Sequence, residues 1–354
     1  MRKLSFGLLC WVVLVLVHFD SFAQLNRKTI KKNNKRIASF KGRKQGFTKE
    51  KKYTSVGFSV NALNYYGDLS PLPSKFSTDI SFTKPAVGIS LNHRFGPRYT
   101  LQAQFMYGTL SGSDAQSAKA GDLNNGVFRH DRNLSFRNRI KELTVVAVFD
   151  LFENDATYIS RVKWTPYVFA GGAIFLHNPQ AIAPATYLDG TPDPYAGKWV
   201  DLRPLGTEGQ YSTLQPTDAN YGIKPYSLLQ FAIPFGVGAR FRLNEVMDLS
   251  ADIGFRYTFT DYLDDVSKNY VDLGVLKSPL AQAMAYRTGE INPDPAKMTS
   301  YVGRDGKTYN VQAGYGQEGF SNWRGNKGSR DIYMVTSIKI SYILGATFHK
   351  AKFR

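Results

Sequence analysis

Residues 229–242 read LQFAIPFGVGARFR, and this stretch decides the fold. Apolar side chains occupy every second position from Leu229 to Phe241, and small, polar or charged residues mostly fill the positions between them. A period of two is that of a β-strand whose two faces meet different environments. A charge facing the middle of a bilayer costs about 2–4 kcal/mol, so Arg240 must point inward if the apolar face meets lipid.

The same alternation recurs along the chain. It is found in residues 53–63, 86–95, 99–108, 140–152, 165–176, 249–259 and 332–344. Together the segments predict an all-β, eight-stranded antiparallel transmembrane β-barrel of OmpA or OmpX size over residues 53–345. The alternative is a soluble β-sandwich or lipocalin-like barrel, which turns its apolar face inward. Small and charged residues crowd the polar face here, which favours the membrane barrel.

The connections between these segments alternate between short and long. Residues 96–98 and 244–245 are tight turns and residues 153–163 a moderate one, whereas the long connections are residues 64–84, 109–136, 178–227 and 260–330. A membrane barrel has short periplasmic turns and longer external loops. Because the number of strands is even, we expect both termini in the periplasm and the barrel in the outer membrane of a Gram-negative cell.

The first residues predict export. Arg2 and Lys3 precede an apolar run over residues 4–17, and Ser21-Phe22-Ala23 offers a cleavage site, so residues 1–23 are typical of a secretory signal peptide. The run is too short for a membrane helix, which needs roughly 20 residues. Cys10, the sole cysteine, lies in this segment. We therefore expect a mature chain without disulfides, thiolate metal sites or a cysteine nucleophile.

The formal net charge of +17 is concentrated in one arm. Residues 27–52 hold twelve Lys and Arg against Glu50, or 12 − 1 = +11. We expect a disordered periplasmic arm over residues 24–52 and a short periplasmic tail over residues 346–354. An acidic periplasmic partner or anionic headgroups fit this charge, whereas an exported barrel meets no nucleic acid. The expected partner contacts are Lys31, Lys32, Lys35, Arg36, Arg43 and Lys44.

Several strands carry charges on the polar face, and these need partners in a narrow barrel. We hypothesise an interior ion network in which Arg240, Arg256 and Lys339 pair with Glu142, Asp150 and Asp252. Barrels of about eight strands have interiors just filled by side chains, so a network is favoured over an open pore.

Two loop segments are candidate sites. Asp261, Asp264 and Asp265 could hold a hard cation such as Ca²⁺, but they lack the spacing of an EF-hand loop. We expect them instead to cap a turn or to pair with loop arginines, and we expect no metal or cofactor. The basic segment from Arg132 to Arg137 could contact lipopolysaccharide phosphates, or it could fold the second loop back onto the rim. Both interpretations stay open.

Catalysis is not expected. The mature chain would keep four histidines, of which His93 falls on the lipid-facing register and His349 lies in the tail. His130 and His177 lie near the external loops and could serve as bases, but no serine motif accompanies them. We therefore expect surface or girdle histidines and a chain that is not an enzyme.

Several local sequences, taken in order, carry a family resemblance. They are Asn64-Tyr65-Tyr66-Gly67-Asp68-Leu69, Arg132-Asn133-Leu134-Ser135-Phe136, residues 165–172 (TPYVFAGG), His177-Asn178-Pro179, residues 234–238 (PFGVG), residues 260–267 (TDYLDDVS) and Asp331-Ile332-Tyr333. This set resembles the PorG-like outer-membrane barrels of Bacteroidetes, which are associated with the type IX secretion system and with gliding. The resemblance covers about residues 53–350, and the long basic arm and extended third and fourth loops depart from it.

The resemblance implies a non-enzymatic barrel that contacts the periplasmic ring of secretion components and ties it to the outer membrane. Lipid, lipopolysaccharide and the periplasmic ring proteins would then be its partners. The alternative is a surface binding or adhesion barrel whose long loops hold a ligand or glycan, since long loops often carry function.

Overall fold

The computed structural model describes residues 47–69, 82–119, 121–123, 126–291, 293–326 and 328–344. The chain divides into residues 1–48 and 49–354, and every element named below belongs to the second part. The expected signal peptide, residues 24–46 of the basic arm and the C-terminal tail lie outside the described residues. Within the described residues, no helix has the length and apolar character needed to cross a membrane.

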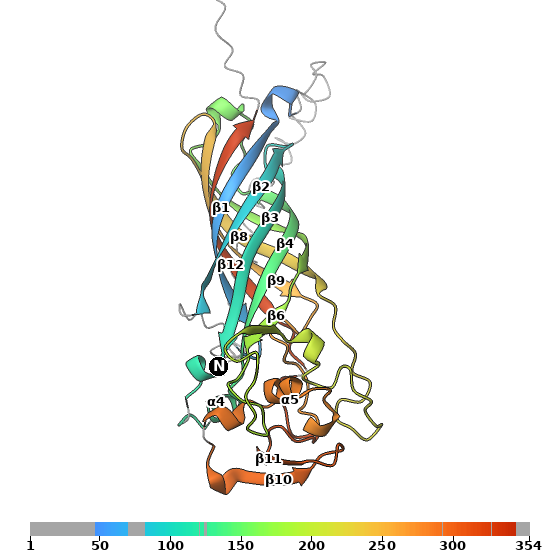
Figure 1. Cartoon of the computed structure of the whole chain (residues 1–354). Coiled ribbons are helices and arrows are strands. Elements are labelled where there is room, and N and C mark those ends of the chain that lie inside the picture. The colour runs from blue at the N-terminus through green and yellow to red at the C-terminus, as the bar shows by residue number, and fades with distance from the viewer. Residues whose placement is uncertain are drawn as a thin grey trace, which may run out of the picture. The chain divides into compact units, whose positions relative to one another are not determined.

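Eight antiparallel strands close into a barrel, which confirms the predicted fold (Figure 1). The strands are β1 (Tyr53–Tyr66), β2 (Lys84–Arg94), β3 (Tyr99–Ser113), β4 (Ser135–Asp150), β5 (Trp164–Leu176), β8 (Leu229–Arg242), β9 (Met247–Thr258) and β12 (Ile332–Leu344). Each strand pairs with the barrel strands before and after it in the chain, and β1 pairs with β12 to complete the circle. Closure leaves no unpaired barrel edge, as a spanning sheet requires.

The outer face of the barrel is apolar. Phe58, Ile89 and Ile338 keep 55%, 59% and 60% of their surface exposed, although each lies in mid-strand. Aromatic side chains flank this belt, with Phe95 stacked on Tyr99 near the short turns. A soluble barrel would bury such side chains, so the soluble alternative is wrong and the outer face is one that meets lipid.

Some strands run further than the alternation predicts. β1 reaches Tyr66, and β3 and β4 continue to pair from Thr109–Arg139 to Ser113–Ser135. These extensions lie at the loop end, where no hydrocarbon selects apolar residues at every second position. The sequence pattern therefore fades there while the hydrogen-bonded ladder continues.

Glycines make room for large rings in the narrow interior. Tyr167, Phe169 and Phe175 of β5 all point inward and are buried. A Cβ atom added at Gly236 or at Gly254 would lie 2.6 Å from Cζ of Phe169, so neither position tolerates a side chain while that ring stays. Glycine on the inward face of β8 and β9 is thus matched to an aromatic ring of β5.

An apolar cluster fills the loop end of the barrel interior. It combines inward side chains of most barrel strands with side chains from the loops, and its largest members include Tyr65, Met106, Phe136, Phe175 and Tyr333. Leu263 from the loop after β9 is fully buried within it. The loops are therefore packed into the mouth of the barrel, burying apolar surface from both.

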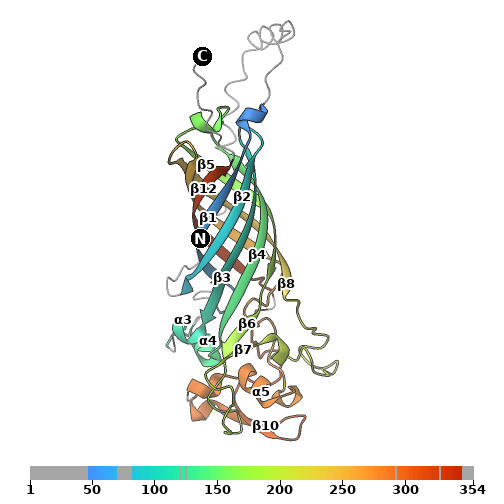
Figure 2. The same ribbon diagram turned by 45° about the horizontal axis from the view of Figure 1, so that its top comes forward.

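The four long connections fold together beyond that mouth, at the lower end of Figure 1 and in Figure 2. We call the described residues of 67–83, 114–134, 177–228 and 259–331 the loop body. Its elements are α3 (Asp114–Ser117), α4 (Val127–Arg132), β6 (Pro179–Ile182), β7 (Trp199–Asp201), η5 (Arg203–Leu205), η6 (Leu273–Val275), α5 (Pro279–Ala285), η7 (Thr288–Ile291), η8 (Pro295–Lys297), β10 (Met298–Val302) and β11 (Thr308–Gln312).

The loop body has an apolar core of its own. Tyr270, Leu273, Ala285 and Val311 are nearly or fully buried in it. At the opposite end of the barrel the connections are short, and include η2 (Lys49–Lys51) before β1 and η4 (Tyr158–Ser160) between β4 and β5. The predicted sorting of long and short connections by side is confirmed.

Candidate functional site

Three ion pairs lie in the barrel interior between the six side chains expected there. Arg240 lies 3.1 Å from Asp150, Arg256 lies 3.3 Å from Glu142, and Lys339 lies 3.8 Å from Asp252. They come from β4, β8, β9 and β12, and alternation turns each of them inward.

Neighbouring polar groups complete these pairs. Tyr333 donates a short hydrogen bond to Glu142, and Tyr167 donates one to Asp252 at 2.9 Å. Lys339 donates to the Gln102 side chain at 3.1 Å. Buried charges need such supporting contacts, because a single opposite charge seldom offsets the loss of water.

The sequence interpretation missed one member of this network. Arg94 of β2 donates to Asp150 at 2.7 Å, closer than Arg240 does, and its side chain is almost fully buried. The signal was available, since Arg94 continues the inward register of Gly88, Ser90 and Asn92. We call Arg94 together with the six expected residues the lumen network.

Little space remains beside the lumen network. Two cavities there, towards the short turns, have volumes of about 30 and 10 Å³. Spaces of this size admit ordered water but no larger solute. The apolar cluster closes the interior at the loop end. Through the described residues, the barrel interior is therefore a packed core.

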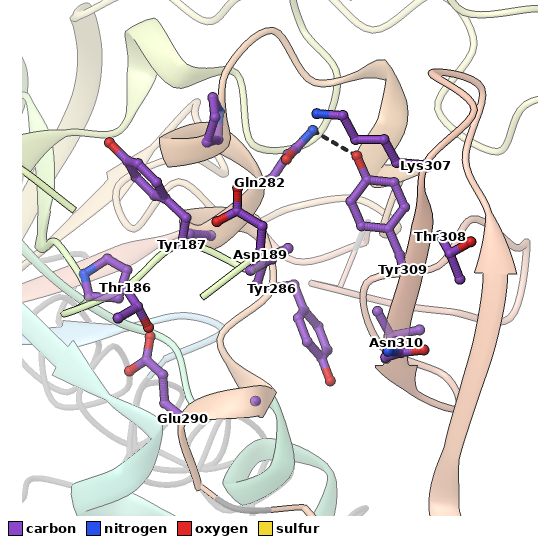
Figure 3. Close-up of a pocket in the computed structure, with 16 residues that line it drawn as sticks. Thr186, Tyr187, Asp189, Gln282, Tyr286, Glu290, Lys307, Thr308, Tyr309 and Asn310 are labelled. Carbon is purple, nitrogen blue, oxygen red and sulfur yellow. Dashed lines mark hydrogen bonds between the residues drawn. The ribbon is translucent and has the colours of Figure 1, made fainter. Parts of the chain in front are cut away.

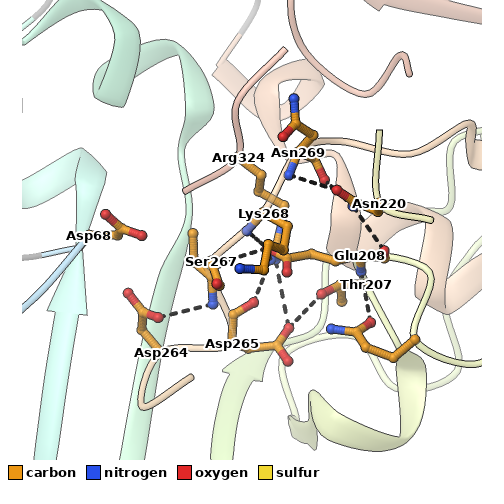
Figure 4. A network of polar contacts seen from close by, with 12 residues as sticks. Asp68, Thr207, Glu208, Asn220, Asp264, Asp265, Ser267, Lys268, Asn269 and Arg324 are labelled. Atoms are coloured by element: carbon orange, nitrogen blue, oxygen red, sulfur yellow. Dashed lines mark hydrogen bonds and ion pairs between the residues drawn. The ribbon is translucent and has the colours of Figure 1, made fainter. Parts of the chain in front are cut away.

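A second polar network lies where the loop body meets the barrel (Figure 4). We call it the mouth network; its charged members are Asp68, Glu208, Asp264, Asp265, Asp331, Arg132 and Arg324. Arg324 donates to Glu208 at 3.1 Å and lies 3.7 Å from Asp265.

Asp265 holds an uncommon backbone conformation in this network. Its φ is 67°, which is rare for a residue with a side chain. Its carboxylate accepts hydrogen bonds from Thr207 at 2.6 Å and from Tyr226 at 2.7 Å. These contacts join the loop after β5 to the loop after β9, so Asp265 links two long loops.

A shared proton joins two further carboxyl groups. The Tyr65 hydroxyl lies 2.7 Å from Asp264 and 2.7 Å from Asp331. A hydroxyl donates only one hydrogen, so the second contact requires a protonated carboxyl group that donates to Tyr65. Burial, helped by the other carboxylates, raises the pKa values of Asp264 and Asp331 well above their usual range. The pair therefore keeps a proton at neutral pH.

The three loop aspartates differ in their contacts. Asp265 pairs with Arg324 and Asp264 accepts a hydrogen bond from the Val266 amide, whereas burial raises the pKa of Asp261 to about 8. Among the described residues, no group of three or more acidic, histidine or cysteine side chains is arranged to hold a metal ion.

The basic segment before β4 splits into two roles. Arg132 is 2% exposed and forms two hydrogen bonds to Asp114, at 2.8 and 2.9 Å. It also donates to the backbone oxygen of Asp68, so it folds the second loop onto the rim and is not available to lipopolysaccharide phosphates. Arg137 points outward, with its guanidinium 3.8 Å from the ring centroid of Trp199.

The two histidines considered as catalytic bases, His177 and His130, already lie beside other polar groups of the protein. His177 is buried, its Nδ1 lies 3.2 Å from the Asn138 amide nitrogen, and its Nε2 lies 3.1 Å from the backbone oxygen of Ser227. Burial lowers its pKa to about 4, so the ring is neutral at pH 7. His130 lies in α4, 3.4 Å from Asp131. His93 is outward on β2 and His349 lies outside the described residues.

The expected periplasmic contacts cannot be placed in the same way. Lys31, Lys32, Lys35, Arg36, Arg43 and Lys44 all lie outside the described residues. Of the basic arm, the structure includes Lys51, which forms an ion pair of 2.9 Å with Asp155 in the turn between β4 and β5.

The loop body also contains a cavity of about 350 Å³ (Figure 3). Its walls come from the loop after β5, from α5 and η7, and from β11. The lining residues are Pro184, Thr186, Tyr187, Leu188, Asp189, Pro279, Gln282, Ala283, Tyr286, Gly289, Glu290, Lys307, Thr308, Tyr309, Asn310 and Val311. No sequence motif marked this site, because three separate segments form it.

Comparison with known proteins gives a family match over part of the chain. Residues 45–191 match the model of a domain of unknown function (DUF6089). No curated protein matches.

Solved barrels show distant similarity. Neisserial surface protein A is 9% identical with a TM-score of 0.32, and outer membrane protein OprG of Pseudomonas aeruginosa is 9% identical with a TM-score of 0.35. A major outer membrane protein of Thermus thermophilus is 11% identical with a TM-score of 0.33. Each match covers 82% of this chain, and 96%, 95% and 99% of the respective structures. The fold assignment rests on the strand pairing and on the apolar outer face.

Proposed function

We propose that this chain is a non-enzymatic outer-membrane barrel that anchors or contacts periplasmic components of the type IX secretion and gliding machinery. The observation that carries the anchoring role is the packed interior, with ion pairs across it and an apolar cluster closing its loop end. A packed interior gives solutes no path through the barrel, which supports a role in holding other molecules at the membrane over one in transport. In planar bilayers we expect negligible conductance, and steady ohmic conductance would contradict the proposal.

The periplasmic side of the proposal draws on charge and on the resemblance. With both termini periplasmic, residues 27–52 would present a net charge of 12 − 1 = +11 to partners beneath the membrane. Charge of one sign attracts acidic surfaces and speeds encounter with them. The ring proteins of the secretion machinery are the partners that the resemblance implies.

The motifs that carry the resemblance meet at the mouth network. Tyr65, Asp68, Arg132, Asp264 and Asp331 each come from one of these motifs. Hydrogen bonds link Tyr65 to Asp264 and Asp331, and Arg132 to the Asp68 backbone. The motifs thus help to hold the loops on the barrel. The partner-binding surface is expected on the opposite side, among the short turns and the basic arm.

The test is a pull-down from cross-linked outer membranes. Residues 27–46 are replaced by a neutral glycine–serine linker of equal length, which leaves every described residue in place. We expect recovery of periplasmic ring proteins to fall sharply while the barrel still shows heat-modifiable migration. Unchanged recovery would remove the basic arm from the proposed contact.

A second candidate function is surface binding or adhesion by the loop body, and the 350 Å³ cavity favours it. Deleting residues 185–222 would be a poor test, because Glu208 and Asn220 in that segment bond to the loop after β9. Point substitutions in the cavity wall keep those contacts, and adhesion of whole cells to a surface is the measurement.

A further inference from the structure

We infer that the cavity between the loop after β5 and β11 binds a neutral saccharide. The inference rests on the second candidate function, surface binding, and names its ligand class. The volume of about 350 Å³ falls within the range of small-molecule sites, about 300–1,000 Å³. A short carbohydrate chain fits a space of this size.

The lining combines aromatic rings with many uncharged polar groups. Tyr187 supplies a partly exposed ring, the buried rings of Tyr286 and Tyr309 form part of the wall, and Gln282 and Asn310 supply amides. Sugar rings present apolar C–H faces that pack on aromatic faces, while their hydroxyls need donors and acceptors around the edge. The chemistry of the wall therefore matches a polyhydroxylated ring better than an acyl chain, which would need a continuous apolar lining.

The charges around the cavity argue against a phosphorylated or otherwise anionic ligand. Glu290 receives two hydrogen bonds of 2.8 Å from Arg287, which neutralise it locally. Lys307, the cation of the lining, lies 3.9 Å from Asp305. Asp189 accepts two hydrogen bonds from Thr191 through its Oδ1, which leaves Oδ2 for ligand hydroxyls.

The wall is held in place before any ligand arrives. The Tyr309 hydroxyl donates to Asp305 at 2.8 Å and accepts from Gln282 at 2.9 Å. The Tyr286 hydroxyl accepts from the backbone N–H of Gln312 at 2.9 Å. Both rings also belong to the core of the loop body. A preformed wall loses little entropy on binding, which favours affinity.

Figure 3 shows how the wall is divided. Tyr187 and Asp189, from the loop after β5, lie on one side of the cavity, and Lys307 and Tyr309, from the β11 segment, lie on the other. Tyr187 and Asp189 are partly or largely exposed and lie outside the apolar core of the loop body, so substituting them should leave that core in place. They are the residues on which the test depends.

The experiment uses the full folded barrel in detergent. The barrel is first applied to an array of bacterial and host saccharides. The neutral saccharide that binds most strongly is then titrated by calorimetry. We expect Tyr187→Ala to weaken binding about tenfold, a change that corresponds to loss of one good ring contact. Asp189→Asn should weaken it by a smaller factor, because an amide keeps one acceptor.

Tyr195→Ala is the matched control. Tyr195 lies in the same loop, is 50% exposed and does not line the cavity, so its removal should change affinity less than about twofold. Heat-modifiable migration verifies that each variant is folded. Failure of the folded barrel to bind any neutral saccharide would overturn the inference, as would equal effects of Tyr187→Ala and Tyr195→Ala.

Two outcomes distinguish failure of this inference from failure of the two proposed functions. Adhesion to a protein or lipid surface without saccharide binding would sustain surface binding and overturn the saccharide site. Saccharide binding that survives replacement of the basic arm, together with unchanged recovery of ring proteins, would sustain the saccharide site and contradict the periplasmic contact of the arm.

Discussion

The lumen network and the mouth network bury charge in opposite ways. In the lumen, Arg94, Arg240, Arg256 and Lys339 face three carboxylates, and each carboxylate lies beside at least one cation. In the mouth network, Arg324 lies beside Glu208 and Asp265, Arg132 pairs with Asp114 and bonds to the Asp68 backbone, and Asp264 and Asp331 keep a proton between them. The lumen is therefore stabilised by ion pairing, whereas the mouth depends in addition on a neutral carboxyl group and its hydrogen bonds.

Because of this difference, the lumen network and the mouth network should respond to different perturbations. Removing a charge should damage the lumen most, because its partners stay buried without compensation. Changing the pH should act on the mouth, because its proton count differs between the folded and unfolded states.

The largest effect is expected from Asp150→Ala. Asp150 accepts hydrogen bonds from both Arg94 and Arg240, and its side chain is 1% exposed. The substitution leaves two guanidiniums in the lumen without their carboxylate, which should cost about 3–5 kcal/mol of unfolding free energy. Urea titration of the barrel refolded in lipid vesicles measures the change.

Asp155→Ala is the matched control for that prediction. Asp155 also pairs with a cation, Lys51, but its side chain is 62% exposed. Water replaces the lost partner, so the cost should be about 0.5 kcal/mol or less. Equal losses for the two variants would show that the lumen is wet and would break the contrast between packed interior and open turn.

A smaller loss of stability is expected from Gly254→Ala. The added methyl group would lie 2.6 Å from Phe169, whose ring cannot leave the closed barrel. Overpacking of this kind costs about 1–3 kcal/mol, and Phe169→Leu in the same chain should restore part of it. Gly172→Ala is the control, because its Cβ meets no atom within 4 Å. An unchanged unfolding free energy for Gly254→Ala would mean that the lumen has unfilled space around Phe169.

The stability of the mouth network should depend on pH more strongly than that of the lumen network. Burial raises the pKa values of Asp68 and Asp265 to about 6 and that of Asp261 to about 8. Carboxyl groups with raised pKa values stabilise the folded state fully below the unfolded value of about 4. That stabilisation is lost as pH rises through about 6 to 8, on the order of 1–3 kcal/mol for the loop body.

Hydrogen exchange measures this response separately for loop and strand peptides. After correction for intrinsic rates, protection of the Leu263 and Val266 amides should fall between about pH 5 and pH 8, because Asp68, Asp261 and Asp265 around this segment lose their protons over that range. Strand peptides of the lumen network serve as the internal reference. Asp261→Asn, which mimics the protonated group, should reduce the dependence. Equal pH slopes in loop and strand would contradict the assignment.

The same contrast explains how much the sequence could predict. Bilayer and lumen impose a period of two, so the outward apolar face and the inward positions of Arg240, Arg256 and Lys339 follow from alternation alone. Which of those residues pair depends on which inward charges lie at the same height along the barrel axis. Arg94 obeys the same rule, so alternation places it inward as well.

The mouth network and the cavity obey no such rule. Tyr65 and Asp331 are 266 residues apart, and Arg132 and Asp68 come from different loops. Nothing periodic relates them, because loops outside the bilayer are shaped by packing against one another. The sequence accordingly left the roles of Arg132 and Arg137 open, although one proves buried and the other outward.

The smallest effect is expected at Arg137, on the outside of the mouth. Its guanidinium lies over Trp199 of β7 and donates to Gln180 of β6 at 3.0 Å. Arg137→Ala should cost about 0.5–1 kcal/mol, since the contact is partly exposed to water. Exchange in the β6–β7 hairpin should rise, while Arg139→Ala, an exposed neighbour on the same strand, should leave it unchanged. An effect as large as that of Asp150→Ala would place Arg137 among the buried ion pairs and erase the distinction between outer rim and lumen.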